Sequence, residues 1–351
     1  MLTYDEILTW LREENQRRIT KLWSRADAVR HASVGDDVHL RGLIEISNHC
    51  VRQCHYCGLR AGNRELTRYR MTGDEILECA RTAQHFCYGT VVLQAGEDPG
   101  ITRDWMVDII RRIKQNTPLA VTLSLGERSC EDLRAWRDAG ADRYLLRFET
   151  SNPALYRQIH PPRPGNSEPD RIVLLRTLRE MGFEVGSGVM IGIPGQRYKD
   201  LADDLELFRR LELDMIGVGP FIPHPKTPLA SAPDNPAAAS NGQVPPSELM
   251  TYKVVALARL ARPEANIPST TALATLNLAE GRELGLKRGA NIVMPNITPP
   301  RYRVHYEIYP AKACIRETAE QCHGCIQRRI ESIGRRIGSG PGASKSFMRR
   351  S

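Results

Sequence analysis

The sequence predicts an α/β protein that forms a full (β/α)8 barrel of the TIM type, with N-terminal helices and a C-terminal extension. Eight short runs rich in β-branched residues alternate with seven amphipathic segments along the chain. Strands that alternate with helices form parallel sheets, and eight such units close into a barrel. A doubly wound sheet is the alternative, but no GxGxxG turn follows the first expected strand. The barrel is therefore favoured.

The expected elements follow one another in a regular order. Residues 4–32 carry helical spacing, and signals such as Thr72 before a helix and Gly140 and Gly182 after helices mark ends. The expected strands are 38–47, 89–97, 120–127, 143–151, 184–194, 214–224, 266–276 and 290–298. The expected helices between them are 72–86, 102–116, 129–140, 169–182, 198–213, 246–261 and 280–289.

These elements divide the chain into three parts. We expect an N-terminal helical extension over residues 1–36, the barrel over 37–300, and a C-terminal extension over 301–351. The last part holds a second group of cysteines and ends in a basic tail, 334–351, whose Gly, Ser, Lys and Arg content predicts flexibility. Residues 227–246, rich in Pro, Ala, Ser and Asn, form either a lid at the catalytic mouth or a simple insertion.

Composition limits the classes of protein that fit. The 351 residues are 41% hydrophobic and 26% charged, which is ordinary for a globular protein. The N-terminus lacks a secretory signal and no apolar run could cross a membrane, so we expect a cytoplasmic protein without a membrane partner. The net charge of +8 comes without an aromatic-interleaved basic face, which argues against nucleic acid and for an anionic substrate or acidic partner.

Three of the nine cysteines stand on one short segment. Cys50, Cys54 and Cys57 have the spacing C-x3-C-x2-C directly after the first expected strand, at the end of the barrel where active sites lie. Structural zinc and ordinary four-iron clusters take four protein ligands, so three thiolates leave one metal position open. A zinc site completed by a distant His or Cys is the alternative. An odd number of cysteines argues against a disulfide framework.

This spacing, with Tyr56 before the third cysteine, resembles the signature of the radical S-adenosylmethionine enzymes. The resemblance implies a [4Fe-4S] cluster held by Cys50, Cys54 and Cys57. It also implies that S-adenosyl-L-methionine (SAM) chelates the fourth iron through its amino and carboxylate groups. One electron then splits the S–C5′ bond and gives a 5′-deoxyadenosyl radical. We therefore expect an enzyme with these two cofactors.

Further segments of the barrel resemble cofactor-binding motifs of the same superfamily. LQAGED, residues 93–98, resembles the GGE motif with Ala95 in place of the first glycine. Arg147 and Glu149 stand two apart on an expected strand and so share a face, where buried charges must be paired or used. Residues 188–195 and 217–223 resemble adenine-binding stretches. The residues assigned to cofactor binding are Gly96, Glu97, Ser124, Arg147, Glu149 and Arg171.

The runs GVGPFIPHP, IPSTTA and GANIVMPN together resemble the biotin synthase-like subgroup, and within it the [FeFe]-hydrogenase maturation family. The resemblance implies action on a cysteine-bound Fe(CO)2CN precursor of the di-iron centre. It implies a tyrosine lyase, a scaffold GTPase and a low-potential electron donor as partners. The expected substrate residues are Thr270, Thr271 and Met294 at the strand ends and Tyr306 near the mouth of the barrel.

A second group, Cys314, Cys322 and Cys325, supports that family, in which many members carry an accessory iron–sulfur site. A zinc site that adds His323 is the rival for this group. Two other functions stay open for the whole chain. One is a radical SAM amino-acid mutase of the methylornithine synthase type, or a thioether-forming enzyme. The other is a non-enzymatic electron-transfer or iron-storage protein with two clusters.

Overall fold

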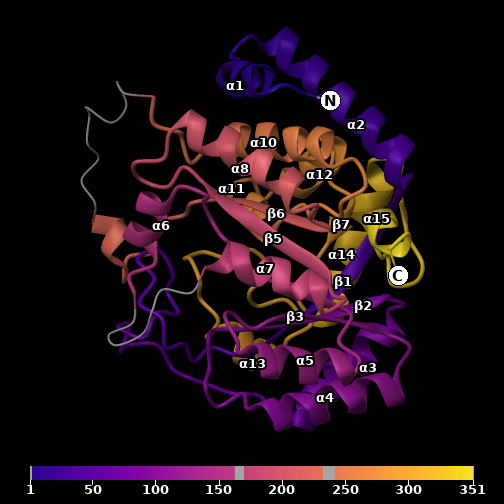
Figure 1. The fold of residues 1–351 in the computed structure, drawn as a ribbon. Coiled ribbons are helices and arrows are strands. Elements are labelled where there is room, and N and C mark those ends of the chain that lie inside the picture. The colour runs from indigo at the N-terminus through magenta and orange to yellow at the C-terminus, as the bar shows by residue number, and fades with distance from the viewer. Residues whose placement is uncertain (1, 163–169, 232–241, 351) are drawn as a thin grey trace.

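The computed structural model describes residues 2–162, 170–231 and 242–350. Its centre is a parallel β-sheet that runs in the order β6-β5-β4-β3-β2-β1-β7 (Figure 1). These strands are β1 Asp37–Ser47, β2 Thr90–Ala95, β3 Ala120–Ser124, β4 Arg143–Leu145, β5 Glu184–Ile191, β6 Met215–Pro220 and β7 Ile292–Val293. The α/β class and the parallel sheet of the sequence prediction are confirmed.

The expectation of eight regular barrel strands was wrong for the segment 266–276. Asn266 and Pro268 form only isolated bridges, to Met215 of β6 and to Ile292 of β7. Beyond them the chain turns into helix α11, Thr271–Leu276, capped by the side chain of Thr270. The run NIPSTTALATL thus combines two bridges with a helix, because Pro268 cannot donate to a ladder and Thr270 caps a helix well.

Helices surround the curved sheet (Figure 1). Those expected from the sequence are α3 Gly73–His85, α4 Arg103–Asn116, α5 Cys130–Asp138, α7 Arg171–Glu180, α8 Tyr198–Arg210, α10 Glu248–Ala261 and α12 Gly281–Lys287. In the view of Figure 1, α3, α4 and α5 lie below the sheet and α8, α10 and α12 lie above it. Residues 4–32 form two helices, α1 Tyr4–Arg12 and α2 Gln16–Val34, which pack on α8 and α10. Not expected were α6 Pro153–Ile159, α13 Pro300–Arg303, α14 Ala319–Ser332, α15 Lys345–Met348 and the 3-10 turn η1 Pro228–Ser231.

The basic tail packs against the barrel and corrects the prediction of a flexible end. Strand β8, Arg336–Ile337, pairs with the first residues of β1, and the C-terminus lies beside that end of the sheet (Figure 1). The carbonyl of Pro341 accepts hydrogen bonds from Arg143 and Thr90, each at 3.0 Å. A Cβ on Gly89 would lie 1.6 Å from the carbonyl oxygen of Gly340. The tail therefore covers the N-terminal end of the barrel in direct contact with the strands.

Most of the proposed lid, residues 232–241, lies outside the described residues. None of the described helices is both long and apolar enough to cross a membrane.

Candidate functional site

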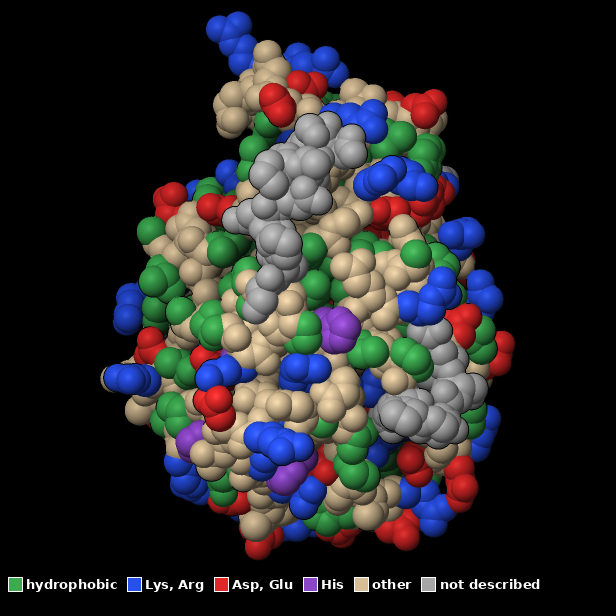
Figure 2. All heavy atoms as spheres, turned by 90° about the vertical axis from the view of Figure 1, so that its left-hand side faces the viewer, with side chains coloured by type: hydrophobic (Ala, Val, Ile, Leu, Met, Phe, Trp, Pro, Cys, Tyr) green, Lys and Arg blue, Asp and Glu red, His purple; other side chains and the backbone are tan. Residues whose placement is uncertain are grey.

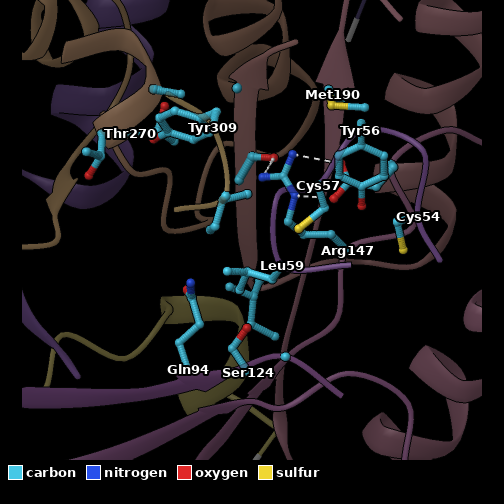
Figure 3. A pocket seen from close by; sticks show the side chains of 18 of the residues that line it. Cys54, Tyr56, Cys57, Leu59, Gln94, Ser124, Arg147, Met190, Thr270 and Tyr309 are labelled. Atoms are coloured by element: carbon cyan, nitrogen blue, oxygen red, sulfur yellow. Dashed lines mark hydrogen bonds and ion pairs between the residues drawn. The ribbon is translucent and has the colours of Figure 1, made fainter. Parts of the chain in front are cut away.

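A cavity of about 360 Å³ opens at the C-terminal ends of the strands. The face of the molecule seen from the left side of Figure 1 carries a mixture of hydrophobic, basic and acidic side chains (Figure 2). Cys54, Tyr56, Cys57, Arg147 and Met190 gather at one side of the cavity (Figure 3). Thr270 and Tyr309 lie at a second side, and Gln94 and Ser124 lie together at a third (Figure 3). The cavity thus joins the cysteine loop to polar side chains of several strand ends.

The cysteine loop follows β1 and is held by backbone hydrogen bonds. The amide of Val51 donates to the carbonyl of Glu97 at 3.0 Å, and that of Gly58 donates to the carbonyl of Ile308 at 2.9 Å. The Arg68 guanidinium donates to four loop carbonyls, those of Asn48, Leu59, Arg60 and Asn63. These contacts fix the loop, so Cys50, Cys54 and Cys57 all line the cavity.

Burial controls the ionisation of the three thiols of the cysteine loop. Burial raises the pKa of Cys54 to about 12 and also raises the pKa values of Cys50 and Cys57. Buried thiols resist ionisation unless a metal replaces the proton. Without a bound metal these thiols therefore stay protonated in the cavity. No cluster of three or more His, Cys, Asp and Glu side chains in the described part of the chain is compact enough for one metal ion.

Gly96 shows why a small residue follows β2. A Cβ at this position would lie 2.3 Å from the carbonyl oxygen of His49 and 2.7 Å from the Cβ of Cys50. The strand end thus touches the start of the cysteine loop, and only glycine permits this approach. Ala95, which replaces a glycine of the superfamily motif, also lines the cavity. Glu97 is buried and lines the same cavity.

Arg147 and Glu149 both face the cavity, as the sequence predicted, but a different backbone brings them together. Strand β4 ends at Leu145, and Glu149 has a φ of 63°, in the left-handed region. The guanidinium of Arg147 nevertheless donates to both carboxylate oxygens of Glu149, at 2.8 and 2.9 Å. Burial disfavours the charge, yet the carboxylate outweighs it and raises the pKa of Arg147. Non-glycine residues in this conformation gather at functional sites.

Arg171, the first residue of α7, points into a second group of charges. Its Nε donates to Glu127 at 2.7 Å, its Nη1 donates to the carbonyl of Arg147 at 2.6 Å, and Glu97 lies 3.6 Å from its Nη2. Arg52 of the cysteine loop also donates to Glu127, at 3.2 Å. The sequence interpretation missed Arg52 and Glu127. The signal was present, since Glu127 follows β3 and Arg52 stands inside the cysteine motif.

The expected substrate residues come together as well. Thr270, Thr271, Met294 and Tyr306 all line the cavity, as does Ser124 at the end of β3. Gln94 of β2 donates to the Tyr306 hydroxyl at 3.2 Å. Further lining residues that the sequence interpretation did not assign to the substrate are Glu45, Leu59, Gln94, Tyr309 and Lys312. Most of them lie one or two residues before a strand end or on the C-terminal extension.

The second cysteine group lies apart from this cavity. None of Cys314, Cys322 and Cys325 is among its lining residues. A hydrogen bond between Cys314 and Cys322 lowers the pKa of the first thiol and raises that of the second. His323 points elsewhere: its Nδ1 lies 3.1 Å from the Tyr88 hydroxyl and its ring stacks on Phe86. This orientation weakens the rival zinc site, which needs the imidazole as fourth ligand.

The sequence is similar to known proteins over most of its length. Residues 44–208 match the Radical SAM superfamily. The [FeFe] hydrogenase maturase subunit HydE of Thermotoga maritima is 47% identical over 92% of this chain and 88% of its own length. The 3-methylornithine synthase of Methanosarcina barkeri is 30% identical over 85% of this chain and 80% of its own.

Solved structures show the same fold. The crystal structure of methylornithine synthase (PylB) has a TM-score of 0.81 at 28% identity, covering 96% of this chain and 94% of that one. The structure of HydG, a maturase of the [FeFe]-hydrogenase, has a TM-score of 0.79 at 21% identity, covering 99% and 76%, and this likeness concerns the fold alone. The superfamily implies a [4Fe-4S] cluster and SAM as cofactors. The chain belongs to the HydE family of radical SAM enzymes.

Proposed function

We propose that this protein cleaves SAM reductively and acts on a cysteine-bound Fe(CO)2CN precursor in the assembly of an [FeFe]-hydrogenase di-iron centre. The observation that carries the proposal is one cavity lined both by Cys50, Cys54 and Cys57 and by a far wall of polar side chains. Enzyme pockets of this kind combine apolar walls with a few convergent polar groups. The similarity to the maturase of Thermotoga maritima supports the choice of pathway.

In this proposal the three cysteine thiolates would hold the cluster. SAM would then be the ligand of its fourth iron, which no cysteine binds. When bound, the pair supplies one-electron cleavage of the S–C5′ bond. The residues of this chain bind and orient the cofactor: Glu149 and Glu97 offer carboxylates, and Arg171 offers a guanidinium for the methionine carboxylate. Gly96 keeps the end of β2 against the loop. Because Arg171 is already held by Glu127 and by the carbonyl of Arg147, its position is set before a ligand arrives.

The proposal is tested by anaerobic reconstitution with iron and sulfide, followed by addition of a low-potential reductant and SAM. We expect 5′-deoxyadenosine or an adenosylated cysteine product, and faster turnover when the products of the tyrosine lyase are added. A new paramagnetic iron species should appear only in the complete mixture. Reconstituted protein that binds iron but never cleaves SAM would disprove the activity.

A mutase of the methylornithine synthase type is the second candidate, because the PylB structure shares this fold at 28% identity. The same reconstituted protein, given amino acids in place of the iron precursor, separates the two. Formation of 3-methylornithine would favour the mutase.

The scaffold GTPase and an electron donor are further partners in the proposed pathway, and loss of hydrogenase activation in cells that lack this protein tests that placement.

We infer that Cys314, Cys322 and Cys325 hold an accessory iron–sulfur cluster. Two of the thiols already share a hydrogen bond, and His323 is turned toward Tyr88. Replacing all three by Ala should remove part of the bound iron and leave 5′-deoxyadenosine formation largely intact, because none of them lines the cavity. Loss of all cleavage in the folded variant, or zinc in place of iron, would contradict this.

We also infer that the barrel closes completely. The bridges at Asn266 and Pro268 continue from β6 to β7, and the amide of Asn291 donates to the carbonyl of Ile267 at 2.9 Å. Slow amide exchange at Asn266 and Asn291, comparable with that of the central strands, is the expected result.

A further inference from the structure

The floor of the cavity is a row of polar side chains on three neighbouring strands. Glu45 of β1 is in register with Gln94 of β2, and Gln94 is in register with Ser124 of β3. All three line the cavity, and Figure 3 shows Gln94 and Ser124 together, apart from the cysteine loop. Polar groups in a barrel interior cost stability unless they have partners or a ligand. This floor is therefore a candidate for substrate recognition.

Lys312 reaches this floor from the C-terminal extension. It is only 6% exposed, and its ammonium pairs with the Glu45 carboxylate. The other oxygen of Glu45 accepts a hydrogen bond from Asn296 at 2.9 Å. The pair holds Lys312 at the cavity, where its ammonium lies 5.2 Å from the centre of the Tyr306 ring. Lys312 is thus a buried cation whose place is set by the first strand.

The ammonium keeps donor capacity for a ligand. It has three protons. Glu45 accepts one, and the carbonyl of Tyr306 lies 3.4 Å away as a weak second acceptor. Among the described residues no third acceptor is bonded to it. The Tyr306 hydroxyl, which accepts from Gln94, likewise has a proton without a described acceptor. Two donors, one of them charged, therefore face the same part of the cavity.

Arg147 and Arg171, which also line the cavity, are more fully engaged by the protein, and Arg52, which keeps two nitrogens without a hydrogen-bond partner, belongs to the cysteine loop. Arg147 forms a two-pronged pair with Glu149 and also donates to the carbonyl of Val189 at 2.7 Å. Arg171 donates to Glu127 and to a backbone carbonyl. Both also stand on the side of the cavity assigned to SAM. An anionic group of a substrate that binds away from the cysteine loop would therefore pair with Lys312.

We propose that Lys312, with the Tyr306 hydroxyl beside it, binds a carboxylate of the substrate on the floor of the cavity. The proposal rests on the proposed function and adds to it a requirement for an amino-acid carboxylate. Glu45 is the positioning residue, because it holds the ammonium in place and partly offsets its charge. The arrangement selects substrates that carry an anionic end opposite the part that meets the radical.

The test compares two synthetic probes, a cysteine-bound Fe(CO)2CN complex and its cysteamine counterpart, which lacks the carboxylate. Binding to the iron-loaded protein is measured anaerobically by equilibrium dialysis, without SAM or reductant, so that no turnover occurs. We expect wild-type protein to prefer the cysteine complex by about tenfold to a hundredfold, as a charge-assisted hydrogen bond provides. Lys312→Met should abolish the preference, and Lys312→Arg should restore part of it.

Lys253→Met is the matched control. Lys253 is another buried lysine, but it donates to the carbonyls of Leu11 and Glu13 under the N-terminal helices, far from the cavity lining. It should keep the wild-type preference. Iron content and thermal unfolding show whether each variant is folded, and Lys312→Gln replaces Lys312→Met if the latter loses its iron.

The outcomes separate the two proposals. If Lys312→Met keeps the preference, or if the wild type binds both complexes equally, the carboxylate site is wrong and the proposed function stands. If the wild type binds neither complex, the proposed substrate is wrong and the carboxylate site falls with it.

Discussion

The two ends of the barrel treat buried charge in opposite ways. At the N-terminal end the chain covers its own charges: Arg143 pairs with Glu184 and donates to the carbonyl of Pro341 in the tail. At the C-terminal end Glu149 and Lys312 are buried too, but they line a cavity. Buried polar groups need partners. Where the tail closes over them the charges serve stability, and where a cavity remains beside them we expect them to serve a ligand.

The largest effect on activity is expected from the loss of a cysteine at the C-terminal end of the barrel, where the cavity lies (the open end). We expect Cys57→Ala to abolish SAM cleavage and lower the bound iron, because the cluster loses a ligand that the loop cannot replace. The free energy of unfolding of the metal-free protein should change little. Cys130→Ala is the control, since this exposed thiol lies on α5 and should alter neither iron content nor 5′-deoxyadenosine formation. Wild-type cleavage by the Cys57 variant would contradict the assignment.

At the N-terminal end of the barrel, which the tail covers (the closed end), Arg143→Met should reduce the stability of the fold. It should leave SAM cleavage at the other end unchanged. It leaves the carboxylate of Glu184 without its main partner, and breaking a buried ion pair costs about 3–5 kcal/mol. Urea unfolding of the metal-free protein measures the loss. The control is Arg349→Ala, which removes an exposed surface pair with Glu264 and should reduce the free energy of unfolding far less than Arg143→Met does. Equal effects of the two variants would show that the tail does not enclose the charges.

A smaller effect is expected for the charges that face the cavity. Glu149→Gln and Arg171→Ala should each weaken SAM binding by about 1–3 kcal/mol, the usual contribution of a hydrogen bond to a charged group. Isothermal titration of the iron-loaded protein checks this, with iron content as the measure of correct loading. If both variants bind SAM as the wild type does, these residues only support the loop.

The smallest effect is expected for Asp204, a buried aspartate that differs from Asp214 in its partners. Asp214, at the closed end, accepts hydrogen bonds from Ser344, Ser346 and Arg350. Near the open end, one carboxylate oxygen of Asp204 accepts a hydrogen bond from the Ser151 amide. Burial raises the pKa of Asp204 to about 8. The folded state therefore holds a proton that the unfolded chain releases near pH 4. The stability due to Asp204 is present at acidic pH and lost as the pH rises toward 8.

Asp204→Asn should remove this dependence. The difference in unfolding free energy between wild type and variant should shift by about 1–2 kcal/mol between pH 6 and pH 8, in favour of the variant at the higher pH. Urea unfolding at the two pH values measures the shift. A constant difference would mean that the carboxyl is ionised throughout this range.

Periodicity predicted most of the elements because it is a local property. The expected helices were all found, and the strands from β1 to β6 appear where apolar runs predicted them, although β4 keeps only three residues. The segment 266–276 was misjudged because Thr270 caps a helix that begins at the next residue. The tail 334–351 was misjudged because its glycines indicate flexibility in isolation, whereas Gly338 and Gly342 here pack against His39.

The sequence by itself predicted the site that is local to one loop: Cys50, Cys54 and Cys57 stand within eight residues, so their spacing could be recognised without a structure. Motifs in the sequence also predicted that Arg147, Glu149 and Arg171 bind the cofactor. Only the tertiary structure paired Glu45 with Lys312, 267 positions apart in the chain, and Arg143 with the tail carbonyl of Pro341, 198 positions away. Such pairs depend on how the barrel brings its ends together, and no periodicity or short motif carries that information.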